Sequence, residues 1–361
     1  MVTTEELTEN KKNLLGMSRA ELEHYLVEEL SEKPFRAKQL TQWVFEKRVK
    51  SFEEMTNISK PSRETMAEHF CFSRPEIVSW QESKDGTIKF LIRLDDGSEV
   101  ESVLICQPKR YTLCVSSQVG CAIGCTFCRT ALMGLSRSLE TSEIIGQAMA
   151  VLDFVDAPPK DVKNKPDPFK NVVFMGMGEP MHNADNVFRA ARIFTDEYGL
   201  QLSYKRVTIS TSGLVPKIEQ FTREQVPASL AISLNATTDE TRTKLIPINK
   251  KWPLKELLTA VKTYTKESGR EVTMEYVMLA GVNDSPEDMA RLQKLVHGFP
   301  MKLNLIPYND NSGLGYFSPA KEKIVSWQRK LNAKGFNARV RWSKGEDIDA
   351  ACGQLAVKDA A

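Results

Sequence analysis

The chain of 361 residues has no long hydrophobic run and only four histidines. No segment approaches the roughly 18 consecutive apolar residues of a transmembrane helix, so we expect no membrane span and no membrane partner. The N-terminal residues MVTTEELTENKK are polar and acidic, which argues against a secretory signal with its apolar centre. Lysine and arginine number 49 against 47 aspartates and glutamates, so overall charge does not mark a nucleic-acid-binding protein. These absences favour a cytoplasmic protein.

The composition is otherwise that of a globular protein, with 41% apolar and 27% charged residues. The cysteines number seven, an odd count that does not suit a complete set of disulfides, and three of them fall within eight residues. In a chain without a secretory signal, such crowding is typical of a metal or redox site.

Residues 1–75 are predicted to form a small helical accessory domain. Ser18 and Glu21 have the spacing of a capping box at the start of one helix, and Pro34 begins a second helix. Residues 76–106 are predicted to form a connecting β-hairpin, because apolar and polar residues alternate on both sides of an Asp-Asp-Gly turn.

Residues 107–345 contain short apolar strands separated by helical stretches, which predicts an α/β fold. The predicted strands are Leu113–Ser116, Val172–Met175, Val207–Ser210, Ser229–Leu234, Val272–Leu279 and Leu303–Ile306. This alternation indicates parallel strands joined by right-handed helical crossovers. About 200 residues for six units suit a partial (β/α)6 barrel better than a doubly wound sheet, although periodicity alone leaves the second open. A C-terminal segment, residues 346–361, follows the barrel.

Chemically capable residues follow the predicted strands, which is where barrels of this kind place their active sites. Five strand ends are rich in small, polar or metal-binding residues: Cys121–Cys128, Gly176–Pro180, Ser210–Gly213, Ser233–Ala236 and Pro307–Asn309. Loops with only a structural role need not share this character. The sequence therefore predicts one site at the carboxyl ends of the strands.

The loop after the first barrel strand holds Cys121, Cys125 and Cys128 in a Cys-x3-Cys-x2-Cys pattern. Three thiolates can hold a 4Fe–4S cluster and leave one iron open. A structural zinc site normally needs four ligands, and none of the histidines flanks this loop. A ferredoxin-like electron carrier needs a fourth local cysteine, which the loop lacks. The open-site cluster is therefore favoured, with zinc and electron-carrier sites as alternatives.

The three-cysteine loop resembles that of the radical S-adenosylmethionine (SAM) superfamily, whose open iron binds SAM. Longer runs are similar to the RlmN branch of RNA methyltransferases: TLCVSSQVGCAIGCTFCRT, VVFMGMGEPMHN, RVTISTSG, IPINKK, EYVML and DIDAACGQL. The resemblance implies methylation of adenine C2 in 23S rRNA (a peptidyl-transferase-centre adenosine) and in tRNA (the adenosine next to the anticodon). It also implies one 4Fe–4S cluster, two SAM molecules per turnover and an electron donor such as flavodoxin or ferredoxin. We expect a monomer.

The resemblance implies that three residues carry the methyl transfer. Cys352 matches a cysteine that is first methylated and then, as a methylene radical, bonds covalently to the RNA base. Cys114 matches the thiol that releases the RNA by forming a disulfide with Cys352, and Glu101 matches the acceptor of the C2 proton. Without the resemblance, both cysteines would be interpreted as small buried residues and Glu101 as an ordinary strand carboxylate. Cys71 and Cys106 match no functional position.

The resemblance also implies SAM contacts by residues at these strand ends: Gly178, Glu179, Ser210, Ser233, Leu234, Asn235 and Asn309. The chain departs from many relatives at one of them, because Asn235 stands where they have the histidine of Ser-Leu-His-Ala. Asparagine can donate and accept hydrogen bonds but does not titrate near neutral pH.

Two stretches rich in basic residues are candidates for RNA phosphate contacts. Residues 33–50 and 321–345 each contain several lysines and arginines and a single glutamate. A solvated helix face explains either stretch equally well. Two other functions stay open: a Cfr-like enzyme that methylates adenine C8 of 23S rRNA, and an iron–sulfur RNA-binding protein without catalysis. A carrier and a resolving cysteine together argue against the non-catalytic protein.

Overall fold

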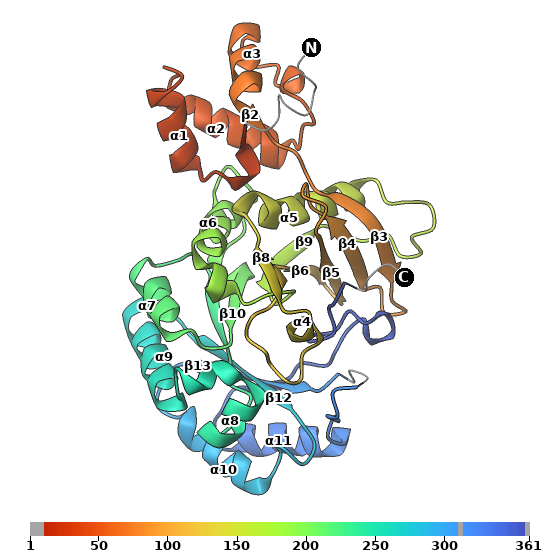
Figure 1. Ribbon diagram of the computed structural model, residues 1–361, viewed down its shortest axis with the longest axis vertical. Helices are drawn as coiled ribbons and strands as arrows, with labels where there is room; N and C mark the ends of the chain where they lie inside the picture. The colour runs from red at the N-terminus through yellow and green to blue at the C-terminus, as the bar shows by residue number, and fades with distance from the viewer. Residues whose placement is uncertain (1–10, 310–312, 358–361) are drawn as a thin grey trace.

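A ten-stranded mixed sheet forms the centre of the structure, a computed structural model in which residues 11–309 and 313–357 are described (Figure 1). From one edge to the other its strands are β14 (Ala338–Val340), β13 (Met301–Pro307), β12 (Val272–Met278), β11 (Ser229–Ser233), β10 (Val207–Thr211), β9 (Phe169–Phe174), β6 (Arg110–Val115), β5 (Glu99–Gln107), β4 (Ile88–Arg93) and β3 (Glu76–Glu82).

The part of this sheet from β6 to β14 is parallel, and each later strand is added on the same side of the one before. Because the strand order never reverses, right-handed crossovers put all the helices on one face, and the sheet curves into an incomplete barrel. The helices are α5 (Thr141–Asp156), α6 (Ala184–Thr195), α7 (Val215–Arg223), α8 (Asp239–Leu245), α9 (Leu254–Ser268), α10 (Pro286–Leu295) and α11 (Lys321–Ala333). Figure 1 shows α6, α7 and α9 along the outer side of the curved sheet.

The predicted partial barrel is therefore confirmed, and all the predicted strands are present. The prediction missed β14, a short strand in which Arg339 alternates with buried Ala338 and half-buried Val340. Its arginine, Arg339, was interpreted only as part of the basic stretch of residues 321–345. It also missed the small pair β7 (Gln118–Gly120) and β8 (Leu135–Ser138), which encloses the three-cysteine loop and the short helix α4 (Arg129–Leu132). Among the described residues, no helix is long and apolar enough to cross a membrane.

The predicted hairpin is present as β4 and β5, but it is not a separate connector. β5 pairs with the barrel strand β6, and an additional strand, β3, pairs with β4, so residues 76–107 extend the main sheet in antiparallel fashion. Buried Gln147 of α5 fixes this junction, because its side chain accepts hydrogen bonds from the Ser102 hydroxyl (2.7 Å) and the Ser116 backbone N–H (2.9 Å).

The N-terminal domain consists of α1 (Arg19–Glu28), α2 (Phe35–Thr41) and α3 (Lys60–His69), closed by the short parallel pair β1 (Lys12–Asn13) and β2 (Phe70–Cys71). The predicted capping box at Ser18 is confirmed, since the Ser18 side chain accepts from Glu21 N–H and Glu21 bonds back to Ser18 N–H.

The basic stretch of residues 33–50 is largely paired with carboxylates. Arg48 bonds Asp156 and Lys50 bonds Asp153, both on α5, and Arg36 bonds Glu32 within the domain. These pairs support an anchoring role for Arg48 and Lys50 between the two domains.

Candidate active site

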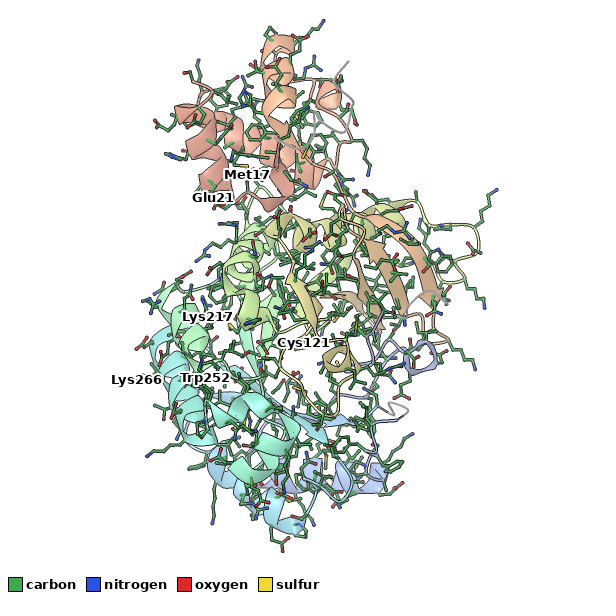
Figure 2. The ribbon with its side chains drawn as sticks, in the orientation of Figure 1. Met17, Glu21, Cys121, Lys217, Trp252 and Lys266 are labelled. Carbon is green, nitrogen blue, oxygen red and sulfur yellow. The ribbon has the colours of Figure 1, made fainter. Side chains whose placement is uncertain are left out.

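Two cavities lie inside the barrel and open at opposite ends of its strands. The first, here the C-end cavity, has a volume of ≈ 170 Å³ and lies where the strands end. It brings together most of the predicted site residues, far apart in the sequence: Cys121, Cys125, Cys128, Gly178, Glu179, Ser210, Ser233, Asn235, Asn309 and Cys352. Figure 2 shows Cys121 near the middle of the molecule, beside α4.

The second cavity, here the N-end cavity, has a volume of ≈ 510 Å³ and lies where the strands begin. Arg110 at the start of β6 and Arg206, next to β10, are at its rim, and Cys114 lies further inside. The two cavities share four lining residues: Met175, Glu275, Ile306 and Cys352. Cys352 therefore lies at the junction of the two cavities.

Hydrogen bonds to the three-cysteine loop hold Cys352 at this junction. The backbone N–H of Arg129 donates to the carbonyl of Gly353 (2.9 Å), and the Thr130 hydroxyl donates to the carbonyl of Leu355 (2.6 Å). On the other side, the Asn309 side-chain amide donates to the carbonyl of Cys352 itself (3.0 Å). All three acceptors are backbone carbonyls of residues 352–355, so these bonds fix the backbone that carries the Cys352 thiol.

Two glycines allow the turn after β9 to lie against the strand beside it. A Cβ at Gly176 would come within 2.7 Å of the Val115 carbonyl oxygen, and one at Gly178 within 2.6 Å of the Gln118 Cβ. Gly178 also has φ +101°, a backbone conformation that favours glycine. The turn Gly-Met-Gly-Glu therefore brings backbone and Glu179 close to the cysteine loop.

The Glu179 carboxylate is buried and accepts hydrogen bonds from Ser212 N–H (2.8 Å) and Met181 N–H (3.0 Å). Burial raises the pKa of this carboxyl, while those hydrogen bonds lower it. Asn235 has φ +54°, a left-handed conformation that asparagine tolerates better than most residues. Its side-chain oxygen accepts from Val277 N–H (2.8 Å), which orients the amide and leaves its NH₂ group and the second lone pair of the oxygen for a ligand.

The Cys114 and Cys352 thiols share a cavity with the half-buried Arg341. The guanidinium of Arg341 donates to Glu275 Oε1 (3.2 Å) and lies 3.2 Å from Met175 Sδ. Nearby Cys352, Glu275 and Cys114 raise the pKa of Arg341. The pKa of Cys114 is raised to about 12, mainly by burial and also by nearby Cys352, whereas Arg341 lowers it. Arg341 is thus the positive charge available to a thiolate at this point.

Comparison with known proteins agrees with this geometry. The N-terminal domain of ribosomal RNA large subunit methyltransferases matches residues 12–72, and the radical SAM superfamily matches residues 115–292. The chain is 43% identical over 357 residues to the dual-specificity RNA methyltransferase RlmN of Desulfotalea psychrophila, and the alignment covers 98% of each chain. It is 47% identical over 337 residues to RlmN of an Anaeromyxobacter species (92% of this chain, 88% of the relative).

The chain belongs to the RlmN family of radical SAM RNA methyltransferases. The crystal structure of a radical SAM methyltransferase from Sphaerobacter thermophilus matches 96% of this chain and all of that one, with a TM-score of 0.86 and 38% identity. The cofactors of the present chain are accordingly a 4Fe–4S cluster and SAM.

The residues of this RlmN-family chain fit such a cluster better than a single ion. Cys121, Cys125 and Cys128 all line the C-end cavity, yet in the described parts of the chain no three potential ligands converge closely enough to hold one metal ion. A cubane binds its cysteines through different irons, so its three thiolates need not meet at a point. Burial raises the pKa of all three thiols, which disfavours thiolates unless a cation accompanies them.

Two of the predicted site residues line neither cavity. The Leu234 side chain is fully buried, and its carbonyl accepts from Arg242 Nε (3.1 Å). Glu101 is buried against the C-terminal segment, where its carboxylate accepts from Lys89 (2.9 Å) and from Ala356 N–H (2.9 Å). Burial is the main cause that raises the pKa of Glu101, and Lys89 opposes it. Its predicted role as a base stays a prediction.

The predicted disulfide is not present. All seven cysteines lie within the described residues, and all of them are free. The structure therefore gives no support for a bond between Cys114 and Cys352.

The sequence interpretation missed Arg242 on α8, a fully buried arginine. Its guanidinium donates to the carbonyls of Ser212 (2.6 Å), Ser233 (3.0 Å) and Leu234 (3.1 Å), and to the Asn249 side chain (2.9 Å). It therefore ties together the ends of β10 and β11, where Ser210 and Ser233 line the cavity. Burial lowers its pKa to about 10, so it stays charged at neutral pH. The run IPINKK, which supplies Asn249, was the available sign of this network.

The first prediction concerns the cluster. Changing Cys121, Cys125 or Cys128 to alanine removes one of three iron ligands, so protein purified without oxygen should fall from about four irons per chain to almost none. Iron analysis checks this, with Cys71→Ala and Cys106→Ala as controls that keep the iron. Wild-type protein with one zinc and no iron would refute the cluster.

The second prediction concerns Arg242. Arg242→Met leaves buried carbonyls without donors, each at a cost of about 1–3 kcal/mol, so the free energy of unfolding should fall by about 3 kcal/mol. Denaturant unfolding measures this loss, and SAM affinity measured by calorimetry should fall with it. Arg189→Met, which removes an arginine with a half-exposed side chain from α6, is the matched control. Equal stability of the two variants would show that Arg242 does not organise the strand ends.

Proposed function

We propose that this enzyme methylates adenine C2 in 23S rRNA and in tRNA, at the peptidyl-transferase-centre adenosine and at the adenosine next to the anticodon. The reaction proceeds through an S-methylcysteine at Cys352 and a covalent RNA intermediate. One observation supports this above the others: Cys352 lies where the cavity of the predicted SAM residues meets the cavity that holds Cys114. A thiol in that place can receive a group on one side and deliver it on the other.

Adenine C2 lies between two ring nitrogens and is electron-poor, so it cannot attack an electrophilic methyl group as an ordinary nucleophile does. Addition of a carbon radical avoids this barrier, and the reduced cluster, when bound, supplies the electron that radical chemistry needs. The cavity supports such chemistry because Glu179 and the strand-end residues Ser210 and Asn235, which line it, are buried away from water.

The chain's own residues divide the work. Cys352 takes up the methyl group, and the positively charged Arg341 lines the same cavity. Glu101, whose pKa is raised by burial, accepts the C2 proton once the C-terminal segment is in place. The Cys114 thiolate then attacks the Cys352 sulfur, and the bond from this sulfur to the methylene carbon breaks. The electron pair of that bond stays with the carbon, which takes up a proton and leaves as the methyl group of the RNA, while the two sulfurs end as a disulfide.

Methylation at adenine C8, as in the Cfr branch, would use the same cysteines. The C2 assignment is supported by the name RlmN of the relatives. This chain is identical to them at 43–47% of the aligned positions. A non-catalytic iron–sulfur protein would have no use for two free thiols beside the cluster cavity. We further propose a monomer in the cytoplasm that receives electrons from a flavodoxin or ferredoxin.

The third prediction tests Cys352 as the methyl carrier. Protein expressed with an intact cluster should carry one extra methyl group on Cys352, because that thiol lines the C-end cavity and no other non-cluster cysteine does. Peptide mass spectrometry locates the group, and Cys352→Ala should form no RNA adduct. A methyl group on another residue, or RNA methylation by Cys352→Ala, would contradict the assignment.

The fourth prediction separates the thiols by the step that each performs. Cys114→Ala should keep its iron, still methylate Cys352 and accumulate covalent protein–RNA complex, because only release requires a second thiolate. A denaturing gel of protein from cells should show a shifted band that nuclease removes. Cys106→Ala, changed on the neighbouring strand β5, should show no such band. Fully methylated free RNA from cells with Cys114→Ala would show that Cys114 is only a packing residue.

A further inference from the structure

The rim of the N-end cavity carries positive charge that the protein does not neutralise. Arg110, Lys205 and Arg206 are all exposed there. Arg110 donates to the Gln107 side-chain oxygen (2.9 Å) and Arg206 to that of Asn171 (3.0 Å), which are neutral groups. In the described chain, none of the three cations forms an ion pair with a carboxylate. This contrasts with Arg48 and Lys50, which are paired.

An exposed tryptophan stands at the same rim. Trp342, two residues after the end of β14, is 45% exposed and lines the N-end cavity with its neighbour Arg341. Tryptophan is a large and mainly apolar side chain. Its exposed ring beside a cavity offers a flat surface on which a planar partner can stack. Nucleobases stack on aromatic rings in proteins that bind single-stranded nucleic acid, and cations beside the ring hold the phosphates.

The interior of the N-end cavity contains many polar side chains beside apolar ones, whereas closed barrels are usually filled with branched aliphatic side chains. Thr112, Asn171, Thr208, Thr273 and Asn304 line it, from five different strands. Its volume of ≈ 510 Å³ falls within the roughly 300–1,000 Å³ of ligand cavities. Such a lining suits a flipped base, which brings several hydrogen-bonding edges. The cavity ends at Cys114 and Cys352.

We propose that the N-end cavity is the entrance for the target nucleotide, an inference that rests on the proposed function. An unpaired RNA strand lies across the rim with its phosphates on Arg110, Lys205 and Arg206 and a base stacked on Trp342. One flipped adenine enters the cavity as far as Cys352. SAM and RNA therefore reach Cys352 from opposite ends of the barrel, so neither has to leave for the other to bind.

The test is RNA binding by the purified iron-loaded protein, with a fluorescent RNA stem-loop that has an unpaired adenosine in its loop. Replacing Arg110, Lys205 and Arg206 together by glutamine should lower the slope of log Kd against log salt by about 2, since each single-strand contact contributes about 0.7. Trp342→Ala should raise Kd about 5–150-fold, as expected for loss of one stacked base, and Trp342→Phe should restore most of the affinity.

The matched control removes the same charge from α9, at Lys255, Lys262 and Lys266, which are exposed, lie outside the cavity and belong to neither basic stretch. It should leave the salt slope unchanged. Iron content and thermal unfolding of every variant show whether it is folded. Rim variants that are folded and bind RNA like the wild type, or an equal loss in the α9 control, would overturn the proposal.

A second measurement needs no variant. Wild-type protein is irradiated with RNA that carries 4-thiouridine next to the target adenosine, and the cross-linked peptide is identified. Cross-links within residues 104–112, 203–208 or 341–345 support the entrance, and cross-links only elsewhere contradict it. If wild-type protein binds at this rim but leaves adenine C2 unmethylated, the proposed function fails and the RNA entrance stands.

Discussion

The bonding of the C-terminal segment to the three-cysteine loop is the contact on which the rest of the site depends. Arg129 N–H and the Thr130 hydroxyl hold the carbonyls of Gly353 and Leu355, so a thiol near the end of the chain is fixed beside the cluster loop. Because the same segment covers Glu101 through Ala356 N–H, it also completes the surroundings of the proposed base. Chemistry at Cys352 therefore requires the whole barrel to be folded first.

Buried charge makes the interior of this barrel different from an ordinary core. Arg242 joins strand ends without a carboxylate partner in its hydrogen bonds, and Arg341 lies between Glu275 and two thiols. Buried charges are costly unless hydrogen-bonded, so their presence indicates groups that are kept for function or for alignment of the strand ends. The two cavities of the barrel share four lining residues, of which Glu275 and Cys352 contribute polar groups.

Sequence patterns predicted the barrel well because its strands are short apolar runs, and they predicted the site because barrel strand ends share one edge. They failed where the signal was not periodic: β14 is three residues long with an exposed arginine in its centre, and Arg242 is a charged residue with no pattern of its own. The basic stretch at residues 33–50 was misleading because charge in a sequence does not show its partners, Asp153 and Asp156. The placement of Cys352 between two cavities depends on contacts more than 200 residues apart in sequence, as between Thr130 and Leu355.

Nucleoside mass spectrometry tests the central claim, transfer of a methyl group through Cys352 to adenine C2, most directly. Ribosomal and transfer RNA are digested from cells that carry the wild-type gene, the Cys352→Ala gene or no gene. The account predicts 2-methyladenosine in both RNAs with the wild-type gene alone. 8-Methyladenosine in its place, or 2-methyladenosine with Cys352→Ala, would contradict it.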